Sequence, residues 1–194
     1  MTLLILGLLL FLGVHSLRIV ADDWRGAMLV RLGEARWKGL VSLLSLAGLM
    51  MIIWGYAAAR QTPQVLWESP LWTRHVAAVL MLVSFVLLVA AYVPGNHLKA
   101  RIHHPMVAAV KVWAFAHLLA NNTLADLLLF GAFLAWAVVD FRSARRREVA
   151  ANAPPPVGRT GPTLIAVVVG LLVWAGFVFW GHRALIGVAP FPAV

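Results

Sequence analysis

The stretch that decides the fold is residues 76–93, VAAVLMLVSFVLLVAAYV, in which no side chain is charged. A helix needs about 20 predominantly apolar residues to cross the hydrocarbon core of a bilayer. The stretch ends at Pro94-Gly95, and a proline does not continue a helix. Residues 76–93 are therefore predicted to form a transmembrane helix.

Similar apolar segments lie on either side of this stretch. They are residues 1–17, 39–59, 105–120, 124–141 and 163–181. The chain is 62% hydrophobic and only 12% charged, whereas about a quarter of the residues in a soluble domain are charged. The sequence therefore predicts an all-α, polytopic membrane helix bundle of about six transmembrane helices in a single domain, 1–194. The first segment lacks a basic N-terminal region and a clear cleavage site, so it is predicted to be a retained helix.

The basic residues are distributed unevenly between the predicted loops. The loops after the first, third and fifth segments hold 12 lysines and arginines, and the opposite side holds 3. Basic loops stay in the cytoplasm, so both termini are predicted to face the periplasm of a bacterial inner membrane. The net charge of +9 is thus interpreted as a topology signal, with the lipid bilayer and no nucleic acid as the partner. The proline-rich stretch 153–162 is interpreted as a linker.

Histidine is the side chain within the predicted helices that is best suited to chemistry. The chain has no cysteine and only 7 acidic residues, which excludes thiol catalysis and leaves no paired carboxylates to act as acid and base. His15 and His117 lie among apolar and aromatic residues, and such a setting suits haem iron better than a hydrated metal ion. In the alternative interpretation, each histidine only hydrogen-bonds to a neighbouring helix or reaches the membrane interface.

A third histidine, His104, stands directly before Pro105, a common first residue of a helix. The 13 positions from His104 to His117 correspond to about 20 Å of rise and about 140° of rotation, so they cannot bind one small metal ion from one continuous helix. His15 and His117 differ by roughly 10 Å in predicted depth. Their pairing therefore requires a tilted cofactor or a kinked helix, and the alternative is a pairing of His15 with His104.

Two further polar residues are candidates beside the histidines. Lys111 falls on the same helix face as His104, where it either extends to the membrane surface or binds a propionate or an anionic substrate group. Residues 123–126, TLAD, have the spacing of a capping box with aspartate in place of the usual glutamate or glutamine. In the alternative interpretation, the Asp126 carboxylate orients His117 as a ligand.

Three sequence elements identify the chain as similar to a known family. They are GVHS at 13–16, HPMV at 104–107 followed by VWAFAHLLAN at 112–121, and DFR at 140–142. Together they resemble the NnrU family of bacterial membrane proteins over essentially the whole chain. The His-Pro…Trp…Ala-His block is the specific part of this resemblance, because the remaining residues are simply hydrophobic.

The resemblance implies a haem protein. NnrU proteins are associated with denitrification and with nitrite or nitric-oxide metabolism, and the family is similar to the plant 15-cis-zeta-carotene isomerase, a membrane protein that binds haem b. Carried over to this chain, the haem ligands match His15 and His117, and His104 matches a further functional histidine. The isomerase has a cysteine directly after the tryptophan, where this chain has Ala114. The ligand switch that uses that cysteine cannot operate here. The resemblance therefore implies redox or isomerase-like chemistry on an apolar or nitrogen-oxide substrate.

Two other functions are compatible with the sequence. The His-His-Pro start of a predicted helix also resembles isoprenylcysteine carboxyl methyltransferases and phospholipid methyltransferases, whose C-terminal Arg and Glu positions serve S-adenosylmethionine. Arg142, Arg145 and Glu148 imitate those positions, with a poorer match in spacing. The third interpretation is a non-enzymatic membrane accessory protein, in which the histidines only pack.

Overall fold

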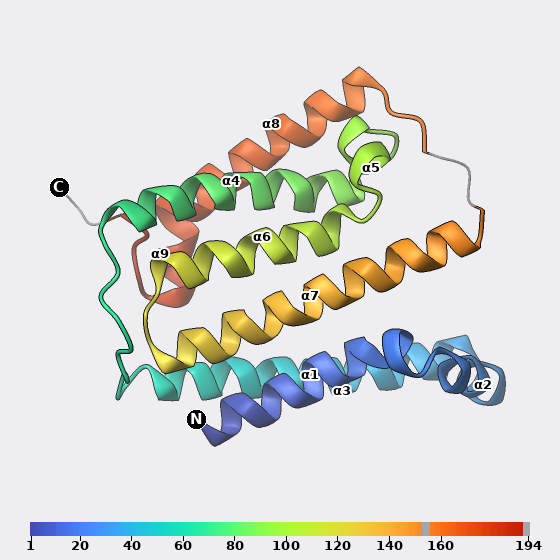
Figure 1. Cartoon of the computed structure of the whole chain (residues 1–194), viewed down its shortest axis with the longest axis horizontal. Coiled ribbons are helices and arrows are strands. Elements are labelled where there is room, and N and C mark those ends of the chain that lie inside the picture. The colour runs from blue at the N-terminus through green and yellow to red at the C-terminus, as the bar shows by residue number, and fades with distance from the viewer. Residues whose placement is uncertain (153–155, 192–194) are drawn as a thin grey trace. The chain divides into compact units, whose positions relative to one another are not determined.

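The computed structural model describes residues 1–152 and 156–191, which are helical almost throughout (Figure 1). In chain order the elements are α1 (Thr2–Val20), α2 (Asp22–Leu32), α3 (Glu34–Ala59), α4 (Trp72–Tyr92), α5 (His97–Ile102), α6 (Pro105–Ala120), α7 (Leu124–Ala150), α8 (Thr160–Gly176), the π-helix η1 (Phe177–Gly181) and α9 (His182–Ile186). Residues 153–155 of the predicted linker lie outside the described residues.

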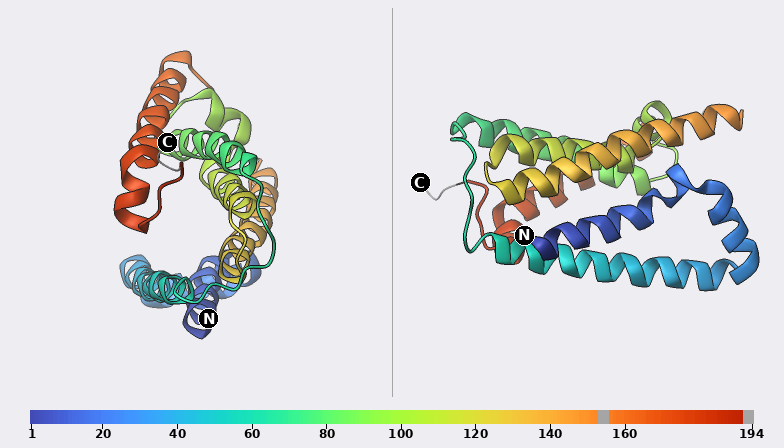
Figure 2. Two further views of the ribbon diagram at one scale, coloured as in Figure 1. Left: turned by 90° about the vertical axis from the view of Figure 1, so that its left-hand side faces the viewer. Right: turned by 60° about the horizontal axis from the view of Figure 1, so that its bottom comes forward.

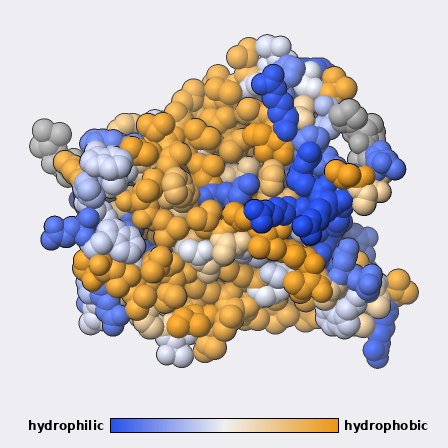
Figure 3. Space-filling model, viewed as in Figure 1, coloured by the Kyte–Doolittle hydropathy of each residue, from blue (hydrophilic) through white to orange (hydrophobic). Residues whose placement is uncertain are grey.

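Six helical segments account for the predicted membrane spans. Among the described residues, α1, α3, α4, α7 and the continuous stretch Thr160–Ile186 are long and apolar enough to cross a membrane, and α6 is a shorter apolar helix. Hydrophobic side chains cover most of the helix lengths, and many hydrophilic ones gather toward helix ends (Figure 3). The prediction of an all-α polytopic membrane bundle of about six helices is confirmed.

Several helices extend beyond the apolar segments that predicted them. Helix α3 begins at Glu34 instead of residue 39, and α7 continues to Ala150 instead of residue 141. Hydropathy detects only the apolar part of a helix, whereas Glu, Lys and Arg are good helix formers and carry the helix on into water. The 27 residues of α7 measure about 40 Å, which exceeds the hydrocarbon core of about 30 Å.

Two of the predicted loops contain helices of their own. Helix α2 lies between α1 and α3 and is separated from α3 by Gly33, whose φ of 78° is a conformation that glycine adopts without strain. Helix α5 begins after Asn96, which is 1% exposed. The Asn96 side chain accepts a hydrogen bond from the Lys99 backbone and donates to the carbonyl of Ala90 at 2.8 Å. These hydrogen bonds satisfy the buried side chain of Asn96 and the backbone groups beside it, and a hydropathy profile does not predict them.

The described residues group into two compact units. The first comprises residues 1–67 and 122–140, and the second comprises 68–121 and 141–194. The first unit therefore holds α1, α2, α3 and most of α7, and the second holds α4, α5, α6, α8, η1, α9 and the basic end of α7. The single domain expected from the sequence stays a prediction.

Close packing of α1 on α3 organises the first unit. Figure 2 shows these two helices side by side, with α2 at one end. A Cβ atom on Gly7 would come within 2.7 Å of the Ile52 backbone nitrogen, and one on Gly48 within 2.8 Å of the Phe11 nitrogen. Small residues that let two backbones approach are the usual means of helix association in membranes, where lipid tails are as apolar as side chains.

Helix α4 lies between α6 and α8 in the second unit (Figure 1). The Ser84 hydroxyl donates to the Ala109 carbonyl at 2.9 Å, and the Trp174 indole donates to the Ala78 carbonyl at 3.1 Å. Both polar side chains thus use a backbone acceptor on the neighbouring helix, which satisfies them in an apolar environment. The predicted span 163–181 is α8 followed by η1, so its last turn is π-helical.

Candidate functional site

His15 lies on α1 in the first unit, and a hydrogen bond sets its tautomer. Its Nδ1–H donates to the Phe11 carbonyl, with 2.7 Å between the two atoms. Because a carbonyl oxygen only accepts, Nδ1 carries the proton and the lone pair of the neutral ring is on Nε2. The ring stacks on Phe11 at a centroid distance of 4.2 Å and meets the edge of Trp136 at 6.1 Å. The side chain of His15 itself is exposed.

An apolar groove of about 380 Å³ lies between α1 and α7 beside this histidine. Gly13 and Ser16 line it from α1, and Ala132 and Trp136 line it from α7. The Trp136 Nε1–H is buried and has no hydrogen-bond partner among the described residues. Buried donors are nearly always paired, so this indole N–H is an exception within the wall of the groove.

His117 repeats the arrangement of His15 on α6 in the second unit. Its Nδ1–H donates to the Trp113 carbonyl at 2.8 Å, and its ring lies 5.3 Å from that of Trp113. Ala114 and Ala116, which precede His117 in the chain, are 0% exposed. The carbonyl of Trp113 therefore accepts the Nδ1–H of His117 as the carbonyl of Phe11 accepts that of His15. The lone pair of the His117 ring is again on Nε2.

These two histidines have the chemistry that a haem ligand needs. A histidine bound to a metal almost always donates its second ring N–H to a carbonyl or carboxylate, which sets the tautomer and the ring orientation. No group of three or more His, Cys, Asp or Glu that could hold a metal ion exists within residues 1–152 and 156–191. Haem carries ring nitrogens of its own and would need only one or two ligands from the protein, so His15 and His117 would suit it.

His104 lies at the opposite end of α6 from His117. It is the N-cap residue of this helix, which runs without interruption from Pro105 to Ala120. His104 and His117 are therefore separated by about 20 Å along the helix axis, as expected for one continuous helix. One small metal ion cannot bind both residues, and His104 has a different set of neighbours.

The neighbours of His104 form a cluster around the carboxylate of Glu148. One carboxylate oxygen lies 2.5 Å from His103 Nδ1, and the other lies 2.8 Å from Arg145 Nη1 and 3.4 Å from His104 Nε2. His103 adopts a positive φ of 65°, which is uncommon for a residue other than glycine. The cluster thus joins the turn between α5 and α6 to the basic end of α7 within the second unit.

Lys111 lies near this cluster and contacts an aromatic ring. Its Nζ atom is 3.7 Å from the centroid of Phe141, which is a cation–π contact. The same ring meets His104 edge-on at 6.1 Å. Lys111 and His104 therefore share one neighbour, in agreement with the seven-residue spacing that placed them on one helix face.

Asp126 forms the capping box that the sequence predicted. Its Oδ2 accepts hydrogen bonds from the Thr123 backbone and hydroxyl at 3.0 and 2.6 Å, and its backbone N–H donates to the Thr123 hydroxyl at 3.3 Å. The other carboxylate oxygen accepts from the Tyr56 hydroxyl. Asp126 is 4% exposed, and these bonds compensate for its removal from water.

Sequence reasoning missed four residues of these arrangements. They are Tyr56, His103, Trp136 and, as the centre of the basic cluster, Glu148. The only available signals were the position of His103 beside His104 and the i, i+3 spacing of Arg145 and Glu148, which is typical of a helical ion pair. Tyr56 and Asp126 are 70 positions apart, and no local pattern connects them.

The fold and the histidine sites together define a class of protein. It is a polytopic α-helical membrane protein that carries histidines within apolar helices. A model of the family described as NnrU protein matches residues 3–190, so the chain belongs to the NnrU family. No curated protein and no solved structure matches the chain.

Proposed function

We propose that this NnrU-family protein binds haem b through His15 and His117. The observation that carries the proposal is the arrangement the two histidines share, in which each ring donates Nδ1–H to the carbonyl four residues earlier. We further propose a bacterial inner membrane with both termini in the periplasm, and a role in denitrification or nitric-oxide metabolism. These last points rest on the distribution of basic residues and on the family resemblance.

The chain's own residues would hold, orient and shield the cofactor. When bound, haem supplies an iron that exchanges electrons and accepts small ligands, such as nitrogen oxides. The Phe11 and Trp113 carbonyls keep each imidazole in the tautomer that presents Nε2. Phe11 and Trp136 pack against the exposed His15 ring and Trp113 packs against His117, and Ala114 offers no thiolate as a replacement ligand. The substrate is therefore proposed to be apolar or a small nitrogen oxide.

An absorption titration of the purified full-length chain tests haem binding. We expect added haemin to give a Soret band that saturates at one haem per chain, because one pair of histidines would hold one haem. A double variant, His15→Ala with His117→Ala, is the control for haem that partitions into detergent. The proposal fails if the unmodified chain gives the same spectrum as this variant.

A membrane methyltransferase is the second candidate, and one observation favours it. His104 and Arg145 both lie against the carboxylate of Glu148, and the methyltransferase likeness singles out all three residues. Calorimetric titration with S-adenosylmethionine is expected to show saturable binding that Glu148→Gln weakens about tenfold, since a charged hydrogen-bond acceptor is lost. Absence of heat with the unmodified chain removes this candidate and leaves the haem proposal untouched.

A further inference from the structure

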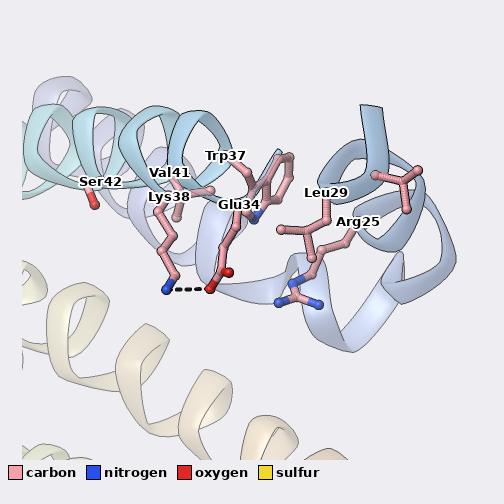
Figure 4. A pocket seen from close by; sticks show the side chains of 8 residues that line it. Arg25, Leu29, Glu34, Trp37, Lys38, Val41 and Ser42 are labelled. Atoms are coloured by element: carbon pink, nitrogen blue, oxygen red, sulfur yellow. Dashed lines mark ion pairs between the residues drawn. The ribbon is translucent and has the colours of Figure 1, made fainter. Parts of the chain in front are cut away.

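A pocket lies between α2 and α3, apart from both histidines. Its volume is about 560 Å³ (Figure 4). The side chains that line it and matter here are Arg25, Leu29, Glu34, Trp37, Lys38 and Val41. All of them belong to the first unit. The proposed haem function uses none of them.

The polarity of α2 places this pocket at the membrane surface. Helices α1 and α3 are candidate spans, and the 11-residue α2 connects them. Its sequence, DDWRGAMLVRL, holds two acidic and two basic residues, which are too costly to place in the hydrocarbon core. Trp24 packs against Trp37 at 5.8 Å, and tryptophans are enriched at the level of lipid headgroups. The pocket therefore opens where headgroups and acyl chains meet.

The charges of the pocket favour an anion. Its lining contains two basic side chains and one acidic one, and the charged ends of Arg25, Glu34 and Lys38 all point to one side (Figure 4). Lys38 pairs with Glu34 at 2.7 Å, and both side chains are more than 70% exposed. Arg25 makes a long contact of 3.5 Å with Asp22. Exposed pairs of this kind contribute little, so most donors of the guanidinium and the ammonium are available to a ligand.

The remaining wall of the pocket is apolar. Leu29 from α2 and Val41 from α3 line it together with Trp37, which is 6% exposed. A site with two cations at one side and an aliphatic and aromatic wall at the other matches a molecule with an anionic head and a hydrocarbon tail. A soluble anion such as inorganic phosphate would use only the first of these features.

We propose that the pocket between α2 and α3 binds an anionic glycerophospholipid, with the phosphodiester between Arg25 and Lys38 and an acyl chain along Leu29 and Val41. Its phosphodiester competes with Glu34 for Lys38 and with Asp22 for Arg25. Bound there, it attaches α2 to the surface of the bilayer from which α1 and α3 emerge.

Native mass spectrometry of the full-length chain, titrated with phosphatidylglycerol, tests this site. Each Lys or Arg near an anionic lipid contributes on the order of 1 kcal/mol, so Arg25→Ala and Lys38→Ala should each weaken the first binding step about fivefold. Arg31→Ala and Arg36→Ala are matched controls, because they remove the same charge from exposed positions outside the pocket. These two variants should bind within about twofold of the unmodified chain, and equal losses in all four would overturn the proposal.

A gain of affinity separates lipid binding from a purely structural role of the ion pair. Glu34→Gln removes the carboxylate that competes for Lys38, and we expect it to tighten phosphatidylglycerol binding severalfold. If Glu34 and Lys38 only stabilise the fold, this variant weakens binding or leaves it unchanged. Phosphatidylcholine should bind more weakly to every variant, and millimolar inorganic phosphate should not displace the lipid. Equal affinity for the two lipids, or displacement by phosphate, contradicts the proposal.

Discussion

Replacing His117 with alanine is expected to weaken haem binding by at least about 100-fold. Loss of a group that merely supports a ligand costs about 10- to 100-fold in metal affinity, and loss of the ligand itself should cost no less. His15→Ala is expected to have an effect of the same order, because its ring is held by the same kind of hydrogen bond. The measurement is the haem dissociation constant from the Soret absorbance of the purified variants.

Two other histidines provide controls for this prediction. His182 also donates its Nδ1–H to a backbone carbonyl, that of Val188 at 2.6 Å, but it follows the predicted span 163–181. His104 contacts Glu148 at the far end of α6 from His117. His182→Ala and His104→Ala should therefore keep the Soret band. Loss of haem in His104→Ala, together with retention in His117→Ala, would instead support the pairing of His15 with His104.

Chemical rescue distinguishes a missing ligand from a misfolded protein. In His117→Gly, added imidazole is expected to restore the Soret band, because it supplies the lost donor atom while the surrounding helix is unchanged. A variant that had simply lost its fold would not respond to imidazole. Circular dichroism of each variant before the titration checks that the helix content is retained.

Local patterns predicted the parts of the structure that depend on local physics. The spans follow from runs of apolar residues, which a bilayer requires to be helical. The capping box at Thr123 and Asp126 involves residues three positions apart, so its spacing was visible. The hydrogen bonds of His15 and His117 were not predicted: the sequence suggested a neighbouring helix as partner, whereas each ring donates to the carbonyl four residues earlier in its own helix, where i and i−4 lie on one face.

The parts that escaped prediction depend on contacts between distant segments. Tyr56 meets Asp126 across 70 positions, and His103 meets Glu148 across 45. Such pairs form only when the helices pack together, and helix packing cannot be predicted from local patterns in a single sequence. Helix α2 escaped for a different reason: its mixture of charged and apolar residues has the hydropathy of a loop, although a surface helix tolerates both.

Asp126→Ala is expected to lower the free energy of unfolding by about 2–4 kcal/mol. Loss of an N-terminal cap costs about 1 kcal/mol, and loss of a buried charged acceptor leaves the Tyr56 hydroxyl unsatisfied at a further cost of about 1–3 kcal/mol. The measurement is unfolding of the detergent-solubilised chain by heat or by denaturing detergent. Asp23→Ala removes an exposed acid of α2 and should change stability by less than about 0.5 kcal/mol. Equal stability of the two variants would contradict the prediction.

Variants of two hydrogen-bond partners show how much each bond of Asp126 contributes to the free energy of unfolding. Tyr56→Phe removes one donor and Thr123→Ala removes the hydroxyl side of the capping box. In double-mutant cycles with Asp126→Ala, each pair should be coupled by about 0.5–3 kcal/mol, as for residues in contact within one network. The same variants decide between the two functions considered for this carboxylate. If Asp126 only caps α7, Thr123→Ala and Asp126→Ala have the same haem spectrum. If its carboxylate orients His117, the spectrum shifts in Asp126→Ala alone.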